Sequence, residues 1–146
     1  MSGPDIGEVA ALLYRYARAV DSHDWELYRS VFTADAHIDY GADVVAGSRD
    51  EVVDWMAGNF SAIPMSMHYI TNVEILAVAD DTATVRAMFY NPMTLPGMAE
   101  LSSCGGYYHH NLVRTPDGWR SRELREEMLW FANPPARGSA TPLPGE

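Results

Sequence analysis

The sequence predicts an α+β fold in which a curved, antiparallel or mixed sheet packs on three N-terminal helices and encloses an apolar pocket. Apolar residues early in the chain recur at the spacing of a helix. The later part contains long, strand-like apolar runs separated by short turn sequences. The length of 146 residues suits one domain with a substantial core. A sheet of this kind, wrapped over helices, forms a cone with the pocket between the layers.

Two helices are expected at the start of the chain. A first helix over roughly residues 5–20 carries one apolar face, made of Ile6, Val9, Leu13, Tyr16 and Val20. A second, short helix is expected in DWELYRSVF, residues 24–32, with Asp24 as its N-cap. Asp24 therefore has a local role, whereas the role of Asp21, at the end of the first helix, depends on what else in the chain faces it.

A short strand and a third helix follow. The segment AHIDY, residues 36–40, alternates between apolar and polar residues as a strand does. Ser48 and Glu51 have the spacing of a capping box, which predicts a helix over about 49–58.

Four long strands are expected in the second half of the chain. They cover residues 65–78, 82–95, 101–115 and 119–131. The sequences ADD and PDG provide two of the turns between them. The glycines of CGGYY lie inside one strand, where they mark a bulge or leave room for a ligand.

The composition limits the classes of protein and partner. The net charge of −10 argues against binding to nucleic acid or to an anionic membrane surface, because both require clustered Lys and Arg. Cys104 is the single cysteine, so no intrachain disulfide can form and a cysteine-based metal site is not expected. We expect one domain over residues 1–132, a disordered tail over 133–146, and a cytoplasmic location, since neither a signal peptide nor a membrane-spanning segment is apparent.

The candidate chemical groups are titratable side chains set among apolar residues. His68 lies within an apolar strand, Asp21 ends the first helix, and Tyr16 lies on that helix's apolar face. Tyr108 and His110 are two residues apart and share one face of their strand. An Asp–His pair in an apolar pocket is a general acid–base unit, since the carboxylate orients the imidazole and stabilises the imidazolium. Composition and spacing alone do not show that Asp21 and His68 meet.

Three segments resemble a known family. YRYARAVDSHDWELYRSVFTADAHIDY (14–40), MHYITN (67–72) and RTPDGWR (114–120) are similar to segments of the scytalone dehydratase family. That family belongs to the SnoaL-like group of the nuclear transport factor 2-like superfamily, whose fold is the cystatin-like cone. The resemblance covers most of residues 6–131 and implies this fold.

The resemblance also implies roles for particular residues. Asp21 would pair with His68, the proton-transferring base, and Tyr40 would polarise a substrate carbonyl. Tyr16 would occupy a slot in which related lyases carry a pocket Tyr or Lys. The residues expected to contact the substrate are Val20, Trp25, Trp55, Met93, Tyr108 and His110, of which Trp25 and Trp55 would also anchor the core.

The chain also departs from the family pattern. Val20 stands where the family has a tyrosine, and Met93 stands where it has a second histidine. Gly106 and Tyr108 replace a serine and an asparagine. The proposed dyad therefore fits the family, whereas the residues that position the substrate differ, so scytalone itself is not the expected substrate.

These observations lead to one main functional hypothesis and two alternatives. The main hypothesis is a cofactor-independent lyase or isomerase, most simply a dehydratase, acting on a hydrophobic cyclic substrate of polyketide or steroid type. It requires no metal. The first alternative is a polyketide cyclase or an epoxide hydrolase, and the second is a non-catalytic small-molecule-binding protein in which His68 is a core histidine and Asp21 belongs to the helix–helix turn. By family resemblance the chain is expected to form a homodimer or homotrimer through its outer sheet face.

Overall fold

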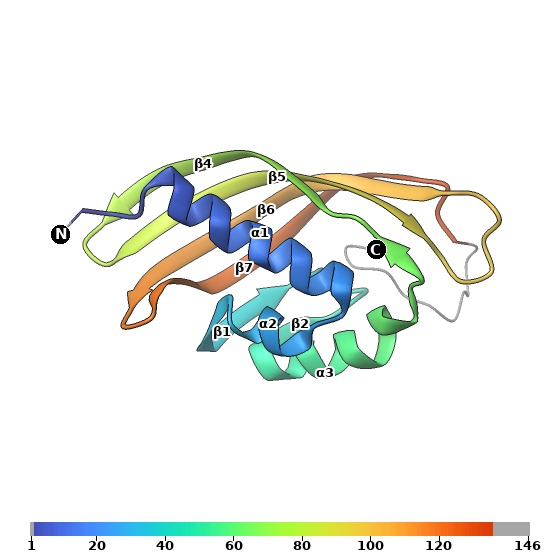
Figure 1. Cartoon of the computed structure of the whole chain (residues 1–146), viewed down its shortest axis with the longest axis horizontal. Helices are drawn as coiled ribbons and strands as arrows, with labels where there is room; N and C mark the ends of the chain where they lie inside the picture. The colour runs from blue at the N-terminus through green and yellow to red at the C-terminus, as the bar shows by residue number, and fades with distance from the viewer. Residues whose placement is uncertain (1, 136–146) are drawn as a thin grey trace.

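A computed structural model describes residues 2–135 of the chain, and Figure 1 shows its arrangement. Three helices lie against one side of a long, curled sheet, which confirms the predicted α+β cone. The elements in chain order are α1 (Ile6–Ser22), α2 (Trp25–Arg29), β1 (Phe32–Asp39), β2 (Ala46–Ser48), α3 (Arg49–Asn59), a 3₁₀ turn (Phe60–Ala62), β3 (Met65–Ser66), β4 (Tyr69–Ala79), β5 (Thr82–Thr94), β6 (Ser102–Thr115) and β7 (Gly118–Ala132).

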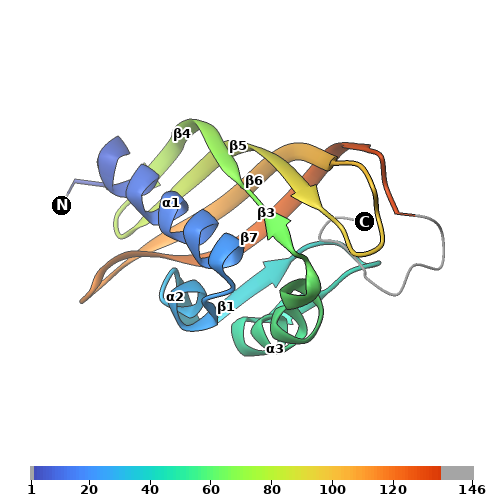
Figure 2. The ribbon, with the colours of Figure 1, turned by 45° about the vertical axis from the view of Figure 1, so that its right-hand side comes forward.

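The strands form one mixed sheet in the order β2-β1-β7-β6-β5-β3, and β4 also pairs with β5. All pairs are antiparallel except β1 and β7, which run parallel. Figure 2 shows β1 continuing the sheet beside β7, below α1. The short strand β2 therefore forms one edge of the sheet, β3 and β4 both pair with β5 at the other edge, and the long strands β5, β6 and β7 form the centre.

The strand expected over 65–78 is interrupted, which corrects the prediction. Residues 67 and 68 separate β3 from β4, so His68 lies in this break and not in the middle of a strand. The opposing position on β5 is Pro92, which accepts a bond from the Met67 amide (3.0 Å) but has no N–H to donate in return. The Asn91 side chain also accepts a bond from that amide (3.1 Å). The ladder is thereby replaced locally by side-chain bonds, and His68 is turned out of it.

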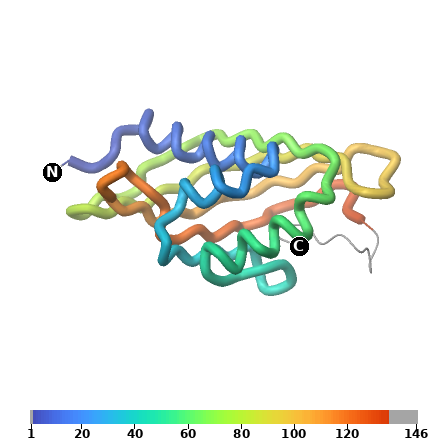
Figure 3. The backbone as a smooth tube through the Cα atoms, turned by 60° about the horizontal axis from the view of Figure 1, so that its bottom comes forward, coloured from blue at the N-terminus to red at the C-terminus, as the bar shows by residue number. Residues whose placement is uncertain are grey.

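Helix α1 is the longest of the three helices and packs against β4 and β7. A capping box between Asp5 and Glu8 starts it, and His23 in the left-handed conformation (φ 55°) ends it. Its buried face includes Leu13, Tyr16 and Val20, as the apolar spacing predicted. In Figure 3 the helix lies along the sheet, with its N-terminus at the same end as the β4–β5 and β6–β7 turns.

Helix α2 is shorter than expected. Asp24 caps it as predicted, accepting a bond from the Leu27 amide (3.1 Å), but the helix ends at Arg29. Strand β1 therefore begins at Phe32, earlier than the predicted 36. Val31 and Phe32 are both buried, so the chain extends as soon as it reaches the sheet.

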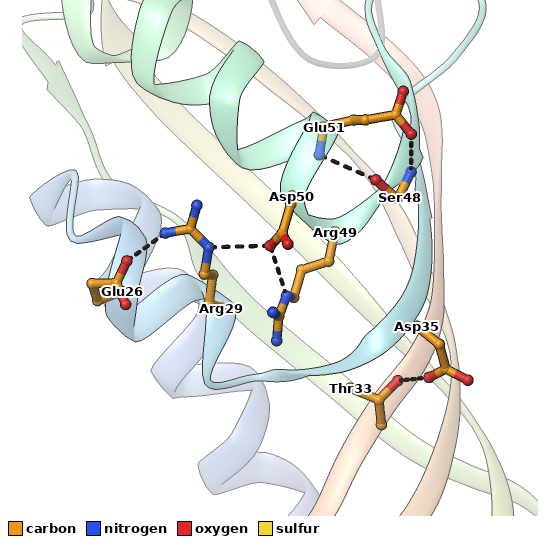
Figure 4. A network of polar contacts seen from close by, with 8 residues as sticks. All are labelled: Glu26, Arg29, Thr33, Asp35, Ser48, Arg49, Asp50 and Glu51. Carbon is orange, nitrogen blue, oxygen red and sulfur yellow. Dashed lines mark hydrogen bonds and ion pairs between the residues drawn. The ribbon is translucent and has the colours of Figure 1, made fainter.

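Helix α3 begins at the predicted capping box, in which Ser48 accepts from the Glu51 amide and Glu51 accepts from the Ser48 amide (both 3.2 Å). Figure 4 shows how α3 is joined to α2: Arg29 contacts Glu26 on its own helix and binds Asp50 of α3 (3.2 Å), which also binds Arg49. These contacts are exposed to solvent, so they orient the helices more than they stabilise them.

Two further expectations concern the limits of the fold. Residues 136–146 of the predicted tail lie outside the described residues, and the domain boundary expected at residue 132 stays a prediction. Within residues 2–135, no helix combines the length and the apolar content that crossing a membrane requires.

Candidate active site

Asp21 and His68 are in direct contact. The Nδ1 atom of the His68 ring lies 2.6 Å from Oδ1 of Asp21, and the His68 backbone amide donates to Oδ2 of the same carboxylate (2.7 Å). The Ser66 hydroxyl donates a further bond to Oδ1 (2.7 Å). The end of α1 is thus joined to the break between β3 and β4, and the carboxylate fixes the plane of the His68 ring.

The hydrogen bonds determine the ionisation of Asp21. Burial alone would raise the pKa of this carboxyl, but the bond from the His68 ring, the charge of that ring, the Ser66 hydroxyl and the His68 amide outweigh burial and lower the pKa below its ordinary value of 3.8. An ionised carboxylate accepts hydrogen bonds only, so the His68 Nδ1–H is the donor.

In the neutral form of the His68 ring, the other nitrogen, Nε2, carries the free lone pair. Nε2 has no hydrogen-bond partner among the described residues. The His68 side chain is 5% exposed and that of Asp21 is 23% exposed, so the pair is shielded yet not sealed from solvent. An oriented imidazole with a free basic nitrogen in a poorly hydrated place can remove a proton from a bound molecule.

A second polar group is formed by tyrosines. The Tyr40 hydroxyl lies 2.5 Å from that of Tyr16 and 2.8 Å from that of Tyr28, and all three side chains are fully buried. Burial raises the pKa of each phenol well above its usual value, so they remain neutral hydrogen-bond donors at physiological pH. Tyr28 was not predicted as a site residue, and no spacing in the sequence marks it.

The Asp–His pair and the tyrosine group are separate within the described residues. Both include a residue of α1, namely Asp21 and Tyr16, but no hydrogen bond joins His68 to Tyr16 or Tyr40. The catalytic roles predicted for these four residues stay predictions.

The residues predicted to contact substrate differ in exposure. Val20, Met93, Tyr108 and His110 are buried, whereas Trp25 and Trp55 are half-buried and pack against the core. Tyr108 and His110 share the inner face of β6, as predicted. His109 points to the outer face, where its ring binds Glu127 (2.8 Å).

Sequence reasoning missed Glu126, which lies opposite Tyr108 in the sheet and therefore on the inner face. Its Oε1 atom is buried with no partner among the described residues. The spacing Leu124–Glu126–Met128 was the available signal, because alternate residues of a strand share a face. Neighbouring Arg and Glu residues on the outer face hid that pattern.

Hollows elsewhere on the surface do not coincide with these groups. One lies between α2, β1 and the β6–β7 turn and is bordered by Arg29, Phe32, Arg49 and Arg120. The apolar pocket expected beside His68 stays a prediction. Residues 2–135 contain no cluster of three or more His, Cys, Asp or Glu side chains placed to hold a metal ion.

The fold and the inward-facing polar groups define a nuclear transport factor 2-like cone. The chain belongs to the SnoaL-like domain family, whose family model matches residues 3–125. It is 35% identical over 115 residues to the uncharacterised protein Rv2910c of Mycobacterium tuberculosis strain H37Rv, covering 77% of this chain and 78% of that protein. The predicted family membership is therefore confirmed.

Two solved structures show the same fold. A candidate scytalone dehydratase from Novosphingobium aromaticivorans superposes with a TM-score of 0.78 at 16% identity, covering 94% of this chain and 92% of that one. The hexachlorocyclohexane dehydrochlorinase LinA-type3 from Novosphingobium barchaimii superposes with a TM-score of 0.75 at 18% identity, covering 94% of each chain. At such low identity these similarities establish the fold alone.

Proposed function

We propose that this protein is a cofactor-independent lyase or isomerase that removes a proton from a hydrophobic cyclic substrate, with dehydration as its reaction. The observation that carries the proposal is the 2.6 Å contact between Asp21 and the His68 ring, which leaves Nε2 of His68 free. Histidine suits proton transfer at neutral pH because its ordinary pKa is about 6.5.

The proposed step is an elimination. Nε2 of His68 takes a proton from the carbon beside a carbonyl group, and Asp21 stabilises the resulting imidazolium. The electron pair of the broken C–H bond forms a carbon–carbon double bond as the C–O bond to a hydroxyl group on the next carbon breaks. The departing hydroxyl takes this proton back from the His68 imidazolium, so water is released, His68 returns to its neutral form, and atoms and charge balance. A buried tyrosine, Tyr40 or Tyr16, would donate a hydrogen bond to the carbonyl oxygen as negative charge develops there.

Dehydration is favoured over other outcomes of the same proton abstraction. The two structural relatives named above are a candidate dehydratase and a dehydrochlorinase, and both names describe eliminations. A polyketide cyclase would use a similar base but conserve the mass of the substrate, and an epoxide hydrolase would add water. The mass of the product therefore distinguishes these three reactions.

A non-catalytic binding protein is the second candidate. It is favoured by one observation: the Tyr40 hydroxyl binds Tyr16 and Tyr28, with no bond towards His68. In that case the Asp21–His68 pair would only hold the β3–β4 break against α1.

The test is an activity screen with matched variants. Purified protein is incubated with β-hydroxy cyclic ketones of increasing ring number, and loss of water is followed by mass spectrometry. We expect His68→Ala to lower the rate by about 10²–10⁴-fold, the usual contribution of general acid–base catalysis, and Asp21→Asn to lower it substantially. The control is His109→Ala, which removes the histidine of the His109–Glu127 pair on the outer face. Equal loss in His109→Ala, or full activity in His68→Ala, would reject His68 as the base.

The outer sheet face supports the proposal of a homo-oligomer. Tyr69, Tyr90 and Trp130 are exposed there on three different strands, and their rings contact one another, with centroids 5.7 Å apart for Tyr69–Tyr90 and 6.0 Å apart for Tyr90–Trp130. We call these three residues the aromatic patch. An exposed aromatic patch of this kind is typical of protein–protein contact surfaces.

A further inference from the structure

Two buried polar atoms lack a hydrogen-bond partner among residues 2–135. They are Nε2 of His110, on β6, and Oε1 of Glu126, on β7. Buried polar groups in native proteins are nearly always hydrogen-bonded, so each unpaired atom calls for a partner that is absent from the chain itself. Neither atom has a role in the elimination step described above.

The tautomer of His110 follows from its neighbours. The Ser121 hydroxyl donates to the Glu123 carbonyl (3.0 Å), which uses its single proton. Ser121 must therefore accept the other bond it makes, from Nδ1–H of His110 (2.9 Å). Burial, and to a lesser extent the nearby His109, lowers the pKa of His110 to about 3, so the ring is neutral. Its Nε2 atom is an acceptor in need of a donor.

Glu126 has the complementary property. Burial raises the pKa of its carboxyl to about 8, so at neutral pH it is mostly protonated and able to donate a hydrogen bond. Although Oε1 is buried, the residue as a whole is only half-buried. The accessible surface of Glu126 therefore belongs to its other atoms.

The two side chains lie on the same face of adjacent strands. Tyr108 is opposite Glu126 and His110 is opposite Leu124, so His110 and Glu126 are diagonal neighbours. Diagonal pairs of this kind lie about 7–8 Å apart at the backbone, with the side chains closer. One oxygen atom that makes a hydrogen bond to each side chain can join two polar atoms about 5.5 Å apart, which is twice the length of an ordinary hydrogen bond.

We propose that His110 and Glu126 together bind one hydroxyl group of an apolar ligand, which donates its proton to Nε2 of His110 and accepts a hydrogen bond from Glu126. A ketone, ether or halide can only accept, so it would leave the His110 nitrogen unpaired. The surroundings are otherwise aromatic: the rings of Tyr16 and Tyr108 both lie 6.5 Å from that of His110. The assignment rests on the proposed function only in taking this ligand to be the hydroxylated substrate.

The experiment separates binding from turnover by using probes that His68 has no means of dehydrating. Dissociation constants are measured by calorimetry for 2-indanol, 2-indanone and indane. We expect 2-indanol to bind roughly 5- to 10-fold more tightly than 2-indanone, the usual effect of pairing a buried acceptor. His110→Phe should remove this preference, and Glu126→Leu should reduce the advantage of 2-indanol over indane. Glu126→Gln, which keeps a neutral donor, should retain the advantage of 2-indanol over indane. His109→Phe, on the outer face, is the control and should change neither comparison.

A second measurement reads the tautomer directly. In ¹⁵N spectra assigned with His110→Phe, Nε2 of His110 should appear as an unprotonated nitrogen that shifts on addition of 2-indanol and not of indane. A protonated Nε2, equal affinity for 2-indanol and 2-indanone, no binding of 2-indanol up to its solubility limit, or an unchanged preference in His110→Phe would overturn the proposal. An unchanged preference in His110→Phe would place the hydroxyl at another group, and the absence of any preference or binding would mean that the two atoms bind an internal water only.

The outcome is independent of the proposed function. If 2-indanol shows the expected preference while no β-hydroxy ketone is converted, the hydroxyl site stands and the dehydratase proposal fails. If His68→Ala loses turnover while the preference for 2-indanol is absent in the wild type, the dehydratase proposal stands and the hydroxyl site fails.

Discussion

Asp21 receives three hydrogen bonds from the short segment Ser66–His68, from one hydroxyl, one backbone amide and one ring. A carboxylate with this number of donors is held in its ionised form and in one position. The same bonds connect the end of α1 to the two-residue break between β3 and β4. At this residue, orientation of His68 and attachment of the helix to the sheet depend on the same contacts.

The stability of the protein should therefore depend on pH through Asp21. Because its pKa is lowered on folding, the ionised carboxylate stabilises the fold above the ordinary value of 3.8, and this contribution is lost as the pH falls through the lower folded-state pKa. We expect Asp21→Asn to cost about 1–2 kcal/mol at neutral pH, with the difference from wild type shrinking below pH 4. Urea unfolding at a series of pH values measures it.

The control for this prediction is Asp54→Asn, on the exposed face of α3. That variant should change stability little at any pH. A constant difference between Asp21→Asn and wild type from neutral pH to pH 3 would contradict the argument from the pKa of Asp21.

At the scale of elements, the bulge between β6 and β7 determines which residues face inward. The register shifts between Gly105 and Gly106, opposite residues 128–130, so that Glu126, Met128 and Trp130 do not keep one uniform alternation. A Cβ at Gly106 would lie 2.0 Å from the Glu127 carbonyl oxygen, which is backbone and has little freedom to move. Glycine at this position lets the two strands approach.

We accordingly expect Gly106→Ala to destabilise the protein by about 1–3 kcal/mol, the usual cost of overpacking. Gly105→Ala should cost less, because the added Cβ would meet only the Trp130 side chain, which can rotate outward. Gly58→Ala in α3, where a Cβ meets nothing, should stabilise the helix by roughly 0.5–1 kcal/mol. Thermal unfolding of the three variants gives the order of their stabilities. A Gly106→Ala variant as stable as wild type would contradict the close approach of β6 and β7 at this position.

Elements whose signals are local could be predicted from the sequence, and those that depend on a distant partner could not. The caps at Asp24 and Ser48 act within three residues, so α2 and α3 began where expected. The β3–β4 break depends on Pro92, across the sheet, and the inward position of Glu126 became evident only from its pairing with Tyr108 of β6. Asp21 and His68 are 47 residues apart, so only a resemblance to a family could suggest their contact.

At the scale of the whole molecule, charge and apolar surface act in opposite directions. The net charge of −10 makes two copies repel each other. The aromatic patch favours association, and the Trp130 indole lies over Gly105, where an added Cβ atom would come within 2.6 Å of it. Because salt screens the repulsion but leaves the apolar contact intact, association of two copies should tighten as ionic strength rises.

Light scattering after size exclusion tests the aromatic patch as the contact surface. We expect the wild type to form a dimer or trimer, and Trp130→Glu to shift it to monomer with an unchanged circular dichroism spectrum, because a buried, unpaired carboxylate is costly at an apolar contact. Ile6→Glu replaces an apolar side chain on α1 that is similarly exposed, 54% against 44% for Trp130, and should leave the oligomer intact. A monomeric wild type at high salt, or an oligomer that survives Trp130→Glu, would show that the aromatic patch does not join copies of this chain. The exposed rings would then remain available for a different partner.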